Sequence, residues 1–408
     1  MSELSDMTVP SPSEPALRHI AMFLHGFEMG GAQRRSLALA GGLAALGVRV
    51  DLVVAQPRGP LLPELPQGIN LVDVGGWRVR LPWFKTKRGR RLAAAVPGLA
   101  LYLRRERPQV LLGTANHAAL PALLAHRLAA PAGTALALRI SNALIGGRNR
   151  IADRAKRWLI RRFYTHADSV LVVARALADE IVRLAPDLAE RTRIVPNPVV
   201  DDTLPGRAAA PPNHAWLRDG GPPVVLGVGR LAEQKDFATL IRAAARVWSR
   251  RPIRLLILGD GRQRAWLSQL VRDHGLDGVV DLPGFDPNPL PAMSHAAVFV
   301  LSSRWEGMPG ALIEAMACGC PVVSADCPGG SREVLRDGEL GPLVPVGDDT
   351  ALAQAIERML DAPTEPARLK ARAQDFSVAA AARAYHAELT QAVRRAAMRL
   401  PAVSGTGS

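Results

Sequence analysis

The sequence predicts an α/β protein built from two parallel-sheet domains. Three observations support this: short apolar runs alternate with longer helix-like stretches, a proline-rich segment interrupts the alternation near the middle, and the alternation then resumes. The chain has 408 residues, of which 48% are hydrophobic. This length suits two domains of about 150 residues or more each, and the apolar fraction excludes a disordered chain. Three cysteines are too few for a disulfide framework.

The expected strands of the first half are short runs rich in Val, Ile and Leu. Nearly continuous apolar strands separated by helices indicate a parallel sheet that is covered on both faces. We expect strands at His19–Leu24, Val48–Val54, Asn70–Val74, Gln109–Gly113, Ala135–Ile140 and Ser169–Val173. Helical patterns lie between several of them, for example at Ser36–Leu46 and Arg90–Arg104.

Seven prolines between Pro196 and Pro223 indicate an interdomain linker. After them we expect strands at Val224–Val228, Ile253–Leu258, Val279–Leu282, Ala297–Leu301 and Pro321–Ser324. We therefore divide the chain into a disordered tail, a first domain, a linker, a second domain and a C-terminal helix. Their respective bounds are 1–17, 18–200, 201–223, 224–374 and 375–397.

Two basic residues follow the first strand of the second domain. In sheets of this kind, ligands bind beyond the carboxyl ends of the strands. The strand Val224–Val228 leads into Gly229, which permits a tight turn, and then into Arg230 and Lys235. Two cations five residues apart on this loop are able to converge on a diphosphate. The alternative is that both are ordinary solvated loop charges.

Two carboxylates follow the strand Ala297–Leu301. Pro309 is suited to begin a helix and Gly319 to end it, which places Glu306 on the preceding loop and Glu314 in the second turn. Free N–H groups at such a helix start bind phosphate, and ionised carboxylates accept hydrogen bonds from sugar hydroxyls. The alternative is one glutamate in an N-terminal turn and one exposed glutamate, neither with a ligand.

Glu306 and Glu314 form an E-x7-E pair that resembles the signature of retaining glycosyltransferases with the GT-B fold. The longer string EGMPGALIEAMACGCPVVSADCPGG resembles family 4 of that class. GRLAEQKDFATLI resembles the family's nucleotide-diphosphate loop, and GFEMGGAQR resembles its first glycine loop. The resemblance covers the chain from about His19 to Arg395. It implies two Rossmann-like domains facing a central cleft, with the acceptor bound by 18–200 and the nucleotide-sugar donor by 224–374. It also implies that the C-terminal helix 375–397 returns to the first domain.

The resemblance also implies roles for individual residues. Arg230 and Lys235 would hold the donor diphosphate. Glu314 would bind the nucleotide ribose, and Glu306 would contact the donor sugar. Gly31 would let backbone N–H groups approach the phosphates, although an ordinary Gly-Gly helix start is the alternative.

Two further residues lie where ligands are expected. His117 falls where the family places a histidine beside the donor sugar, so His117 and Glu306 are the catalytic candidates, while His25 is a weaker one. A lone histidine is otherwise more often structural. Arg139 would face the acceptor at the end of its strand. Relatives often carry Asn at the position of Gly310, a departure that leaves the donor identity open.

We expect no metal and no cofactor, with the nucleotide diphosphate-sugar as substrate. The chain contains no D-x-D sequence, and the family resemblance implies metal independence. Cys318, Cys320 and Cys327 lack a fourth ligand at a spacing typical of zinc sites. We therefore expect them to be small buried residues.

The net charge of +14 lies entirely in the first half. Residues 1–200 hold 28 Lys and Arg against 14 Asp and Glu, whereas residues 201–408 hold 23 of each. Basic residues are interleaved with aromatic ones in Trp77–Arg91 and Arg148–Arg162, a pattern that suits an anionic membrane surface. The second segment also reads as an amphipathic helix packed on the sheet with its charges solvated.

The N-terminus lacks the features of a signal peptide, and no segment reads as a membrane span. We therefore expect a cytoplasmic protein that binds peripherally at the inner face of the cytoplasmic membrane.

The expected function is retaining transfer of a hexose or N-acetylhexosamine from a nucleotide diphosphate-sugar to a lipid-linked or cell-surface glycan. Such a reaction belongs to polysaccharide or lipopolysaccharide biosynthesis, and the resemblance implies uracil as the commonest base of the donor. A nucleotide-sugar epimerase or a phosphorylase of the same fold remains an alternative. A basic nucleic-acid-binding protein is a third, although no recognised nucleic-acid motif appears and the neutral half carries the strongest motifs.

Overall fold

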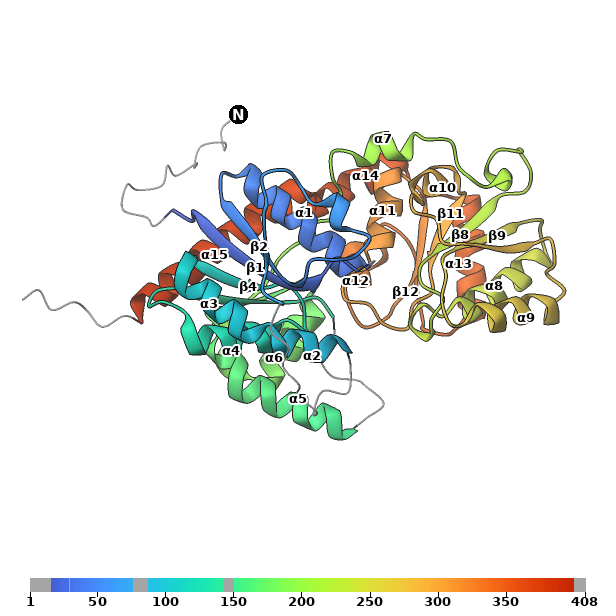
Figure 1. Ribbon diagram of the computed structural model, residues 1–408. Coiled ribbons are helices and arrows are strands. Elements are labelled where there is room, and N and C mark those ends of the chain that lie inside the picture. The colour runs from blue at the N-terminus through green and yellow to red at the C-terminus, as the bar shows by residue number, and fades with distance from the viewer. Residues whose placement is uncertain (1–15, 29, 76–86, 143–149, 400–408) are drawn as a thin grey trace, which may run out of the picture.

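The computed structural model describes residues 16–28, 30–75, 87–142 and 150–399, and it contains two parallel sheets, one in each half of the chain (Figure 1). Both sheets are covered by helices on their two faces. This confirms the predicted α/β class with two Rossmann-like domains.

The first sheet has seven strands in the order β3-β2-β1-β4-β5-β6-β7. Their bounds are β1 His19–Gly26, β2 Arg49–Gln56, β3 Asn70–Asp73, β4 Val110–Gly113, β5 Ala135–Ile140, β6 Ser169–Val172 and β7 Thr192–Ile194. The second sheet has six strands in the order β10-β9-β8-β11-β12-β13. Their bounds are β8 Val224–Val228, β9 Arg254–Leu258, β10 Val280–Gly284, β11 Val298–Leu301, β12 Val322–Ala325 and β13 Leu343–Val344.

Every predicted strand is confirmed, with ends that differ by two residues or fewer. The two strands that were not predicted, β7 and β13, lie at the edges of their sheets. They contain only three and two residues. An element this short has no apolar run of its own, so neighbouring strands define it rather than local sequence.

Helices cover both faces of the first sheet. Their bounds are α1 Gly31–Ala45, α2 Lys87–Ala94, α3 Val96–Glu106, α4 Ala119–Ala129, α5 Arg150–Phe163, α6 Arg175–Leu184 and α15 Val378–Met398. One core contains side chains of α2 to α6, and the other contains side chains of α1 and α15. The single helix expected at Arg90–Arg104 is two helices, because Pro97 falls in the first turn of α3 and cannot continue α2.

The C-terminal helix α15 belongs to the first sheet's layers although it follows the second domain in sequence. Figure 1 shows this red helix lying beside the blue α1. Tyr385 and Leu389 of α15 are fully buried in the same core as Leu43 of α1. The chain therefore crosses between the domains twice.

The second domain has helices on both faces of its sheet as well. Their bounds are α7 Leu204–Ala208, α8 Phe237–Trp248, α9 Arg264–Asp273, α10 Leu290–His295, α11 Gly310–Cys318, α12 Ser331–Val334, α13 Asp349–Asp361 and α14 Pro366–Ala373. Side chains of α8, α9 and α13 form one core, and those of α10, α11 and α14 form the other.

The segment 201–223, expected to be a linker, packs on the second domain. Leu204 and Leu217 are buried in one of its cores, because burying such side chains is favourable wherever an apolar surface is within reach. The crossings between the domains lie just before this segment and just before α15. There the N–H groups of Val199 and Val200 donate to the carbonyl of Phe376 at 2.9 and 3.1 Å.

The range 1–17, expected to be a disordered tail, includes one residue that packs in the fold. Leu17 is buried in the core of the first sheet, and residues 1–15 lie outside the described residues. No helix in the described part of the chain is both long and apolar enough to cross a bilayer.

Strand order places the ligand-binding edge of each sheet. The order reverses between β1 and β4 in the first sheet and between β8 and β11 in the second. Ligands of such sheets bind at the carboxyl ends of the strands beside this switch point. The loops after these four strands, together with the helices that follow them, carry every predicted site residue except Arg139, which lies within β5.

Candidate active site

A cavity of about 350 Å³ lies between the two domains at this edge. From the first domain, Gly30 and Arg34 line it. The second domain contributes Val228, Gly229, Arg230, Leu258, Gly259, Asp260, Phe285, Asp286 and Pro289. A ligand in this cavity would therefore contact both domains at once.

Arg230 brings positive charge to the cavity wall. Its side chain is exposed, and no carboxylate among the described residues pairs with it. Lys235 lies differently, because its Nζ is 2.6 Å from Glu306 Oε1. Gly229 makes this possible: a Cβ there would lie 3.1 Å from Lys235 Cε, so the glycine lets the lysine fold back over the strand end. Arg230 is therefore available to bind an anion in the cavity, whereas Lys235 is oriented by Glu306.

Glu306 is held from three sides. It is 8% exposed, and its Oε1 accepts hydrogen bonds from Lys235 Nζ and from Ser303 Oγ at 2.7 Å. Its own N–H donates to the carbonyl of Pro328 at 3.0 Å. Ser303 was not among the predicted site residues. Its sequence signal was its position just after β11 and three residues before Glu306. Because Lys235 and Ser303 both bond to Oε1 of Glu306, its Oε2 remains available to a ligand.

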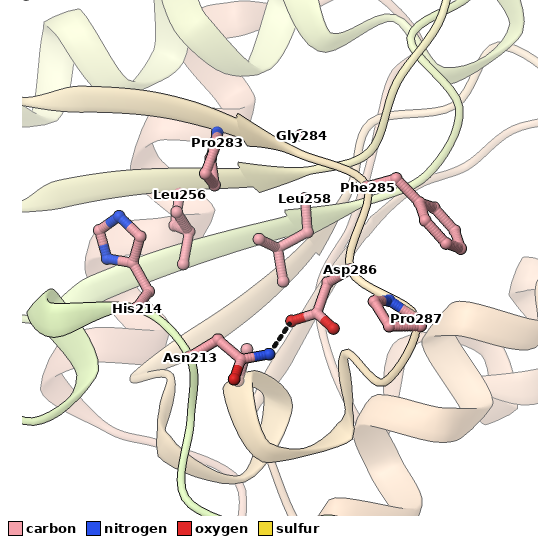
Figure 2. A pocket seen from close by; sticks show the side chains of 10 residues that line it. Asn213, His214, Leu256, Leu258, Pro283, Gly284, Phe285, Asp286 and Pro287 are labelled. Carbon is pink, nitrogen blue, oxygen red and sulfur yellow. Dashed lines mark hydrogen bonds between the residues drawn. The ribbon is translucent and has the colours of Figure 1, made fainter.

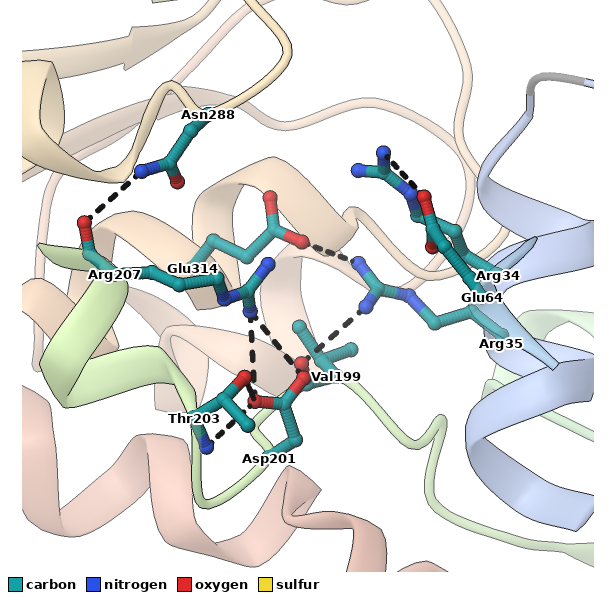
Figure 3. Close-up of polar contacts among 9 residues, drawn as sticks. All are labelled: Arg34, Arg35, Glu64, Val199, Asp201, Thr203, Arg207, Asn288 and Glu314. Carbon is teal, nitrogen blue, oxygen red and sulfur yellow. Dashed lines mark hydrogen bonds and ion pairs between the residues drawn. The ribbon is translucent and has the colours of Figure 1, made fainter. Parts of the chain in front are cut away.

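Helix α11 begins and ends where the sequence indicated. Pro309 is its N-cap, and Gly319 closes it at φ 82°, a conformation that favours glycine. Glu314 lies in the second turn, where its Oε1 pairs with Arg35 Nη2 of the first domain at 2.7 Å (Figure 3). Arg35 was not among the predicted residues. Its only sequence signal is that it follows the glycine loop.

The loop that carries Glu306 meets the first domain at Ser141, beside the loop that carries His117. Asn116 accepts a hydrogen bond from Ser141 N–H at 3.0 Å and donates one to the carbonyl of Asn142 at 2.7 Å. A Cβ at Gly307 would lie only 1.8 Å from the Ser141 carbonyl oxygen. Gly307 therefore permits a close backbone contact that brings the loop before α11 against the loop beside His117.

His117 and His25 lie together at the edge of the first sheet. Their rings are 6.4 Å apart between centroids and meet edge to face. His25, at the end of β1, is 1% exposed, whereas His117 is partly exposed in the loop after β4. Adjacent strands thus place two imidazoles at the switch point, with His117 the more accessible.

Two predicted residues lie differently from expectation. Gly31 is the first residue of α1, and it is the preceding Gly30 that lines the cavity. Arg139 does not face an acceptor: it lies within β5, is 1% exposed, and donates to Asn197 Oδ1 at 2.6 Å. Side chains alternate along a strand, so Arg139 points to the face covered by α15, where it packs 5.9 Å from the Tyr385 ring.

The cysteines are packing residues. Cys320 and Cys327 are buried and Cys318 is partly buried. Burial raises the pKa of all three thiols, that of Cys327 to about 11, so they stay protonated at neutral pH. Among the described residues, no three His, Cys, Asp or Glu side chains are grouped to hold a metal ion.

A second cavity of about 160 Å³ adjoins the first and shares Leu258, Phe285 and Asp286 with it (Figure 2). Its lining is mostly apolar. At the rim, Asn213 Nδ2 donates to Asp286 Oδ2 at 3.3 Å. Apolar walls with an amide and a carboxylate at the rim suit a planar polar ring.

Of the two basic segments, the structure describes mainly the second. Most of Trp77–Arg91 lies outside the described residues. In α5, Ile160 is 2% exposed and packs on the sheet, whereas Trp158 is 60% exposed. The described basic side chains of α5, all exposed, are Arg154, Lys156, Arg157, Arg161 and Arg162. The helix therefore packs on the sheet and presents an aromatic side chain among cations.

Comparisons with known proteins agree with this geometry. Residues 29–203 match the family model described as Glycosyltransferase Family 4, and residues 213–376 match that described as Glycosyl transferases group 1. A solved structure of Anabaena Alr3699/HepE in complex with UDP and glucose superposes with a TM-score of 0.74 at 20% identity, covering 91% of this chain and 99% of that one.

Two curated relatives match about half of the chain. One is the N-acetylgalactosamine-N,N'-diacetylbacillosaminyl-diphospho-undecaprenol 4-alpha-N-acetylgalactosaminyltransferase of Campylobacter jejuni, 31% identical over 52% of this chain and 56% of the relative. The other is the lipopolysaccharide core biosynthesis glycosyltransferase LpsE of Rhizobium meliloti, 34% identical over 49% and 59%. The chain spans a little over half the length of these relatives. With both halves matched and the fold shared, the chain belongs to the family 4 glycosyltransferases of the GT-B fold.

Proposed function

We propose that this protein is a retaining, metal-independent glycosyltransferase that moves a hexose or N-acetylhexosamine from a uridine diphosphate-sugar to a lipid-linked or cell-surface glycan. The observation that carries the proposal is the interdomain cavity. The first domain's glycine loop lies on one side of it, and Arg230 lies on the other. Lys235, Glu306 and Glu314 lie on the neighbouring loop and helix of the second domain.

The donor diphosphate would be held by cations and by a helix start. Arg230 supplies a forked guanidinium for phosphate oxygens. Lys235 uses one N–H on Glu306 and retains two donors for the phosphates, since an ammonium has three. The N-terminus of α11 adds its free N–H groups and its dipole. In metal-dependent transferases a divalent metal neutralises the diphosphate. Here these cations and the helix N-terminus would neutralise it instead.

The sugar and ribose would be bound by the two carboxylates. Glu306 keeps Oε2 for a hydroxyl of the donor sugar, while Lys235 and Ser303 hold its other oxygen. Glu314 would accept from the ribose hydroxyls. His117, across the close contact at Gly307, would reach the sugar from the first domain. The adjoining cavity with Asn213 at its rim is the place for the base.

Transfer breaks the bond between the anomeric carbon and the diphosphate oxygen and forms one to the acceptor oxygen on the same face of the sugar. The acceptor proton passes to the departing phosphate. Negative charge develops on the diphosphate, so the cations at Arg230 and Lys235 stabilise the transition state more than the ground state. Retention by this route needs no nucleophile from the protein.

The names of similar proteins support the proposed donor and acceptor. A neighbour of the same fold was solved with UDP and glucose. The Campylobacter relative is named for a diphospho-undecaprenol acceptor, and LpsE is named for lipopolysaccharide core synthesis. A lipid-linked diphosphate acceptor also suits the basic first half of this chain, because anionic groups are attracted to it.

Membrane contact is part of the proposal. Exposed Trp158 among the cations of α5 suits an anionic inner leaflet, so the enzyme would bind peripherally at the cytoplasmic face of the membrane. Flotation with neutral and anionic liposomes tests this. Binding to anionic vesicles that falls on Trp158→Ala supports it, and equal binding to both vesicle types refutes it.

The proposed reaction has a direct test. Nucleotide-sugars are screened by thermal shift, and the stabilising donor is incubated with a lipid-linked acceptor, with and without EDTA. The expected result is an α-linked product from an α-linked donor by NMR, unaffected by EDTA. Conversion of the donor without any acceptor would indicate an epimerase instead. Displacement of the donor by DNA or heparin, with no product, would indicate a nucleic-acid-binding protein.

A further inference from the structure

Arg35 connects the first domain to the carboxylate proposed to bind the ribose. It extends from α1 across the cleft, and its Nη2 is 2.7 Å from Glu314 Oε1 (Figure 3). Its Nη1 donates to the carbonyl of Val199 at 3.3 Å, in the first crossing between the domains. The two paired side chains are only 13% and 24% exposed. The ion pair is therefore largely shielded from water, where it is stronger than at an open surface.

Gly310 leaves the room that Arg35 occupies. A Cβ at Gly310 would lie 2.6 Å from Arg35 Nη2, too close for the guanidinium to stay where it is. Any side chain at this position would displace the arginine. The contact between Arg35 and Glu314 therefore depends on the glycine at position 310.

The ion pair is not the sole connection between the domains. The chain itself crosses between them twice, and the two crossing segments are bonded to each other where Val199 and Val200 donate to the carbonyl of Phe376. What the pair does fix is the orientation of Glu314, because Oε1 is taken by Arg35 and Oε2 is left for a second partner. A carboxylate held by a single oxygen in this way presents the other oxygen in one direction.

We infer that Arg35 is a positioning residue that orients Glu314 toward the ribose hydroxyls from the opposite domain. Recognition of the ribose then depends on the closed arrangement in which α1 reaches α11. The inference rests on the proposed function, in which Glu314 binds the ribose. It adds to that function a specificity residue contributed by the acceptor domain.

The test is the preference for ribose over deoxyribose. Affinities for UDP, GDP and ADP are measured by calorimetry, and the tightest is compared with its 2′-deoxy and 3′-deoxy counterparts. The wild-type protein should prefer the ribonucleotide. Glu314→Ala should abolish the preference, and Arg35→Ala should reduce it about tenfold, the size of one charge-assisted hydrogen bond. Arg35→Ala added to Glu314→Ala should cause no further loss.

Two variants separate positioning from a general effect on folding. Gly310→Ala keeps the arginine but displaces its guanidinium, so it should lower the preference as well. Arg35→Lys should restore part of it. The matched control is Arg368→Ala, which removes a half-exposed ion pair with Glu339 at 2.6 Å. Neither residue lines the two cavities of the site, so the variant should leave the preference unchanged.

The outcomes distinguish this inference from the proposed function. If Glu314→Ala loses the ribose preference while Arg35→Ala and Gly310→Ala keep it, the role of Arg35 is refuted and that of Glu314 stands. If the wild-type protein shows no ribose preference, the ribose assignment of Glu314 fails and the inference fails with it. Equal loss of preference in Arg368→Ala would show a general disturbance and would also refute the positioning role.

Discussion

Removing the ammonium of Lys235 should affect both stability and turnover. Glu306 is 8% exposed and accepts only two side-chain hydrogen bonds among the described residues, from Lys235 and Ser303. Lys235→Met leaves this buried carboxylate with the serine alone. Breaking a buried ion pair costs about 3–5 kcal/mol, and the Lys235 side chain is 19% exposed, so we expect the lower end of that range.

The expected loss of turnover is larger than the loss of stability can explain. A preorganised donor to a developing charge contributes about 10²–10³ to kcat, so Lys235→Met should lower kcat by that factor at a temperature where the variant remains folded. Urea unfolding measures the stability, and single-turnover transfer measures the chemical step. The charge-neutral double variant Lys235→Met with Glu306→Gln should recover stability but not turnover. Near-normal turnover in Lys235→Met would refute the assignment.

Three further predictions concern other positions. Gly307→Ala places a methyl group 1.8 Å from the backbone oxygen of Ser141, so the domains cannot close and kcat should fall about 10²-fold with little change in the unfolding midpoint. Burial alone would raise the pKa of Asp51, but hydrogen bonds from a histidine and a tyrosine outweigh it and lower that pKa below the ordinary 3.8. The stability it contributes is therefore full above pH 3.8 and is lost as the pH falls further, and Asp51→Asn should flatten the acid limb of unfolding curves. Arg139→Ala should destabilise the protein by about 2–4 kcal/mol in urea while leaving the KM for the acceptor unchanged, and a raised KM would contradict its place in the core.

The sequence was most informative where the chemistry is local. The run from Glu306 to Glu314, with Pro309 between them, predicts a helix start between two carboxylates because capping and helix geometry depend on neighbours in the chain. Strand ends were predicted closely for the same reason, since a buried parallel strand is an unbroken apolar run. Edge strands as short as β13 carry no such pattern.

For Arg139 the strand was predicted correctly, but the expected exposure of its side chain to an acceptor was not. The strand Ala135–Ile140 was predicted correctly, yet the side of the sheet that each residue faces depends on which helices cover it. Only the return of α15 decides that the face of Arg139 is interior, through its contact with Tyr385. A helix more than 200 residues later in the chain cannot be assigned to that face from local pattern.

The sequence by itself determined the family, the two parallel sheets and the set of side chains beyond the strand ends. These depend on periodicity, capping and short motifs, all of which act over a few residues. The tertiary structure alone decided which groups meet: the pairing of Lys235 with Glu306, the close approach at Gly307, and the contact of Arg35 with Glu314. Those contacts join residues 71 to 279 positions apart, and only the packing of the two domains brings such residues together.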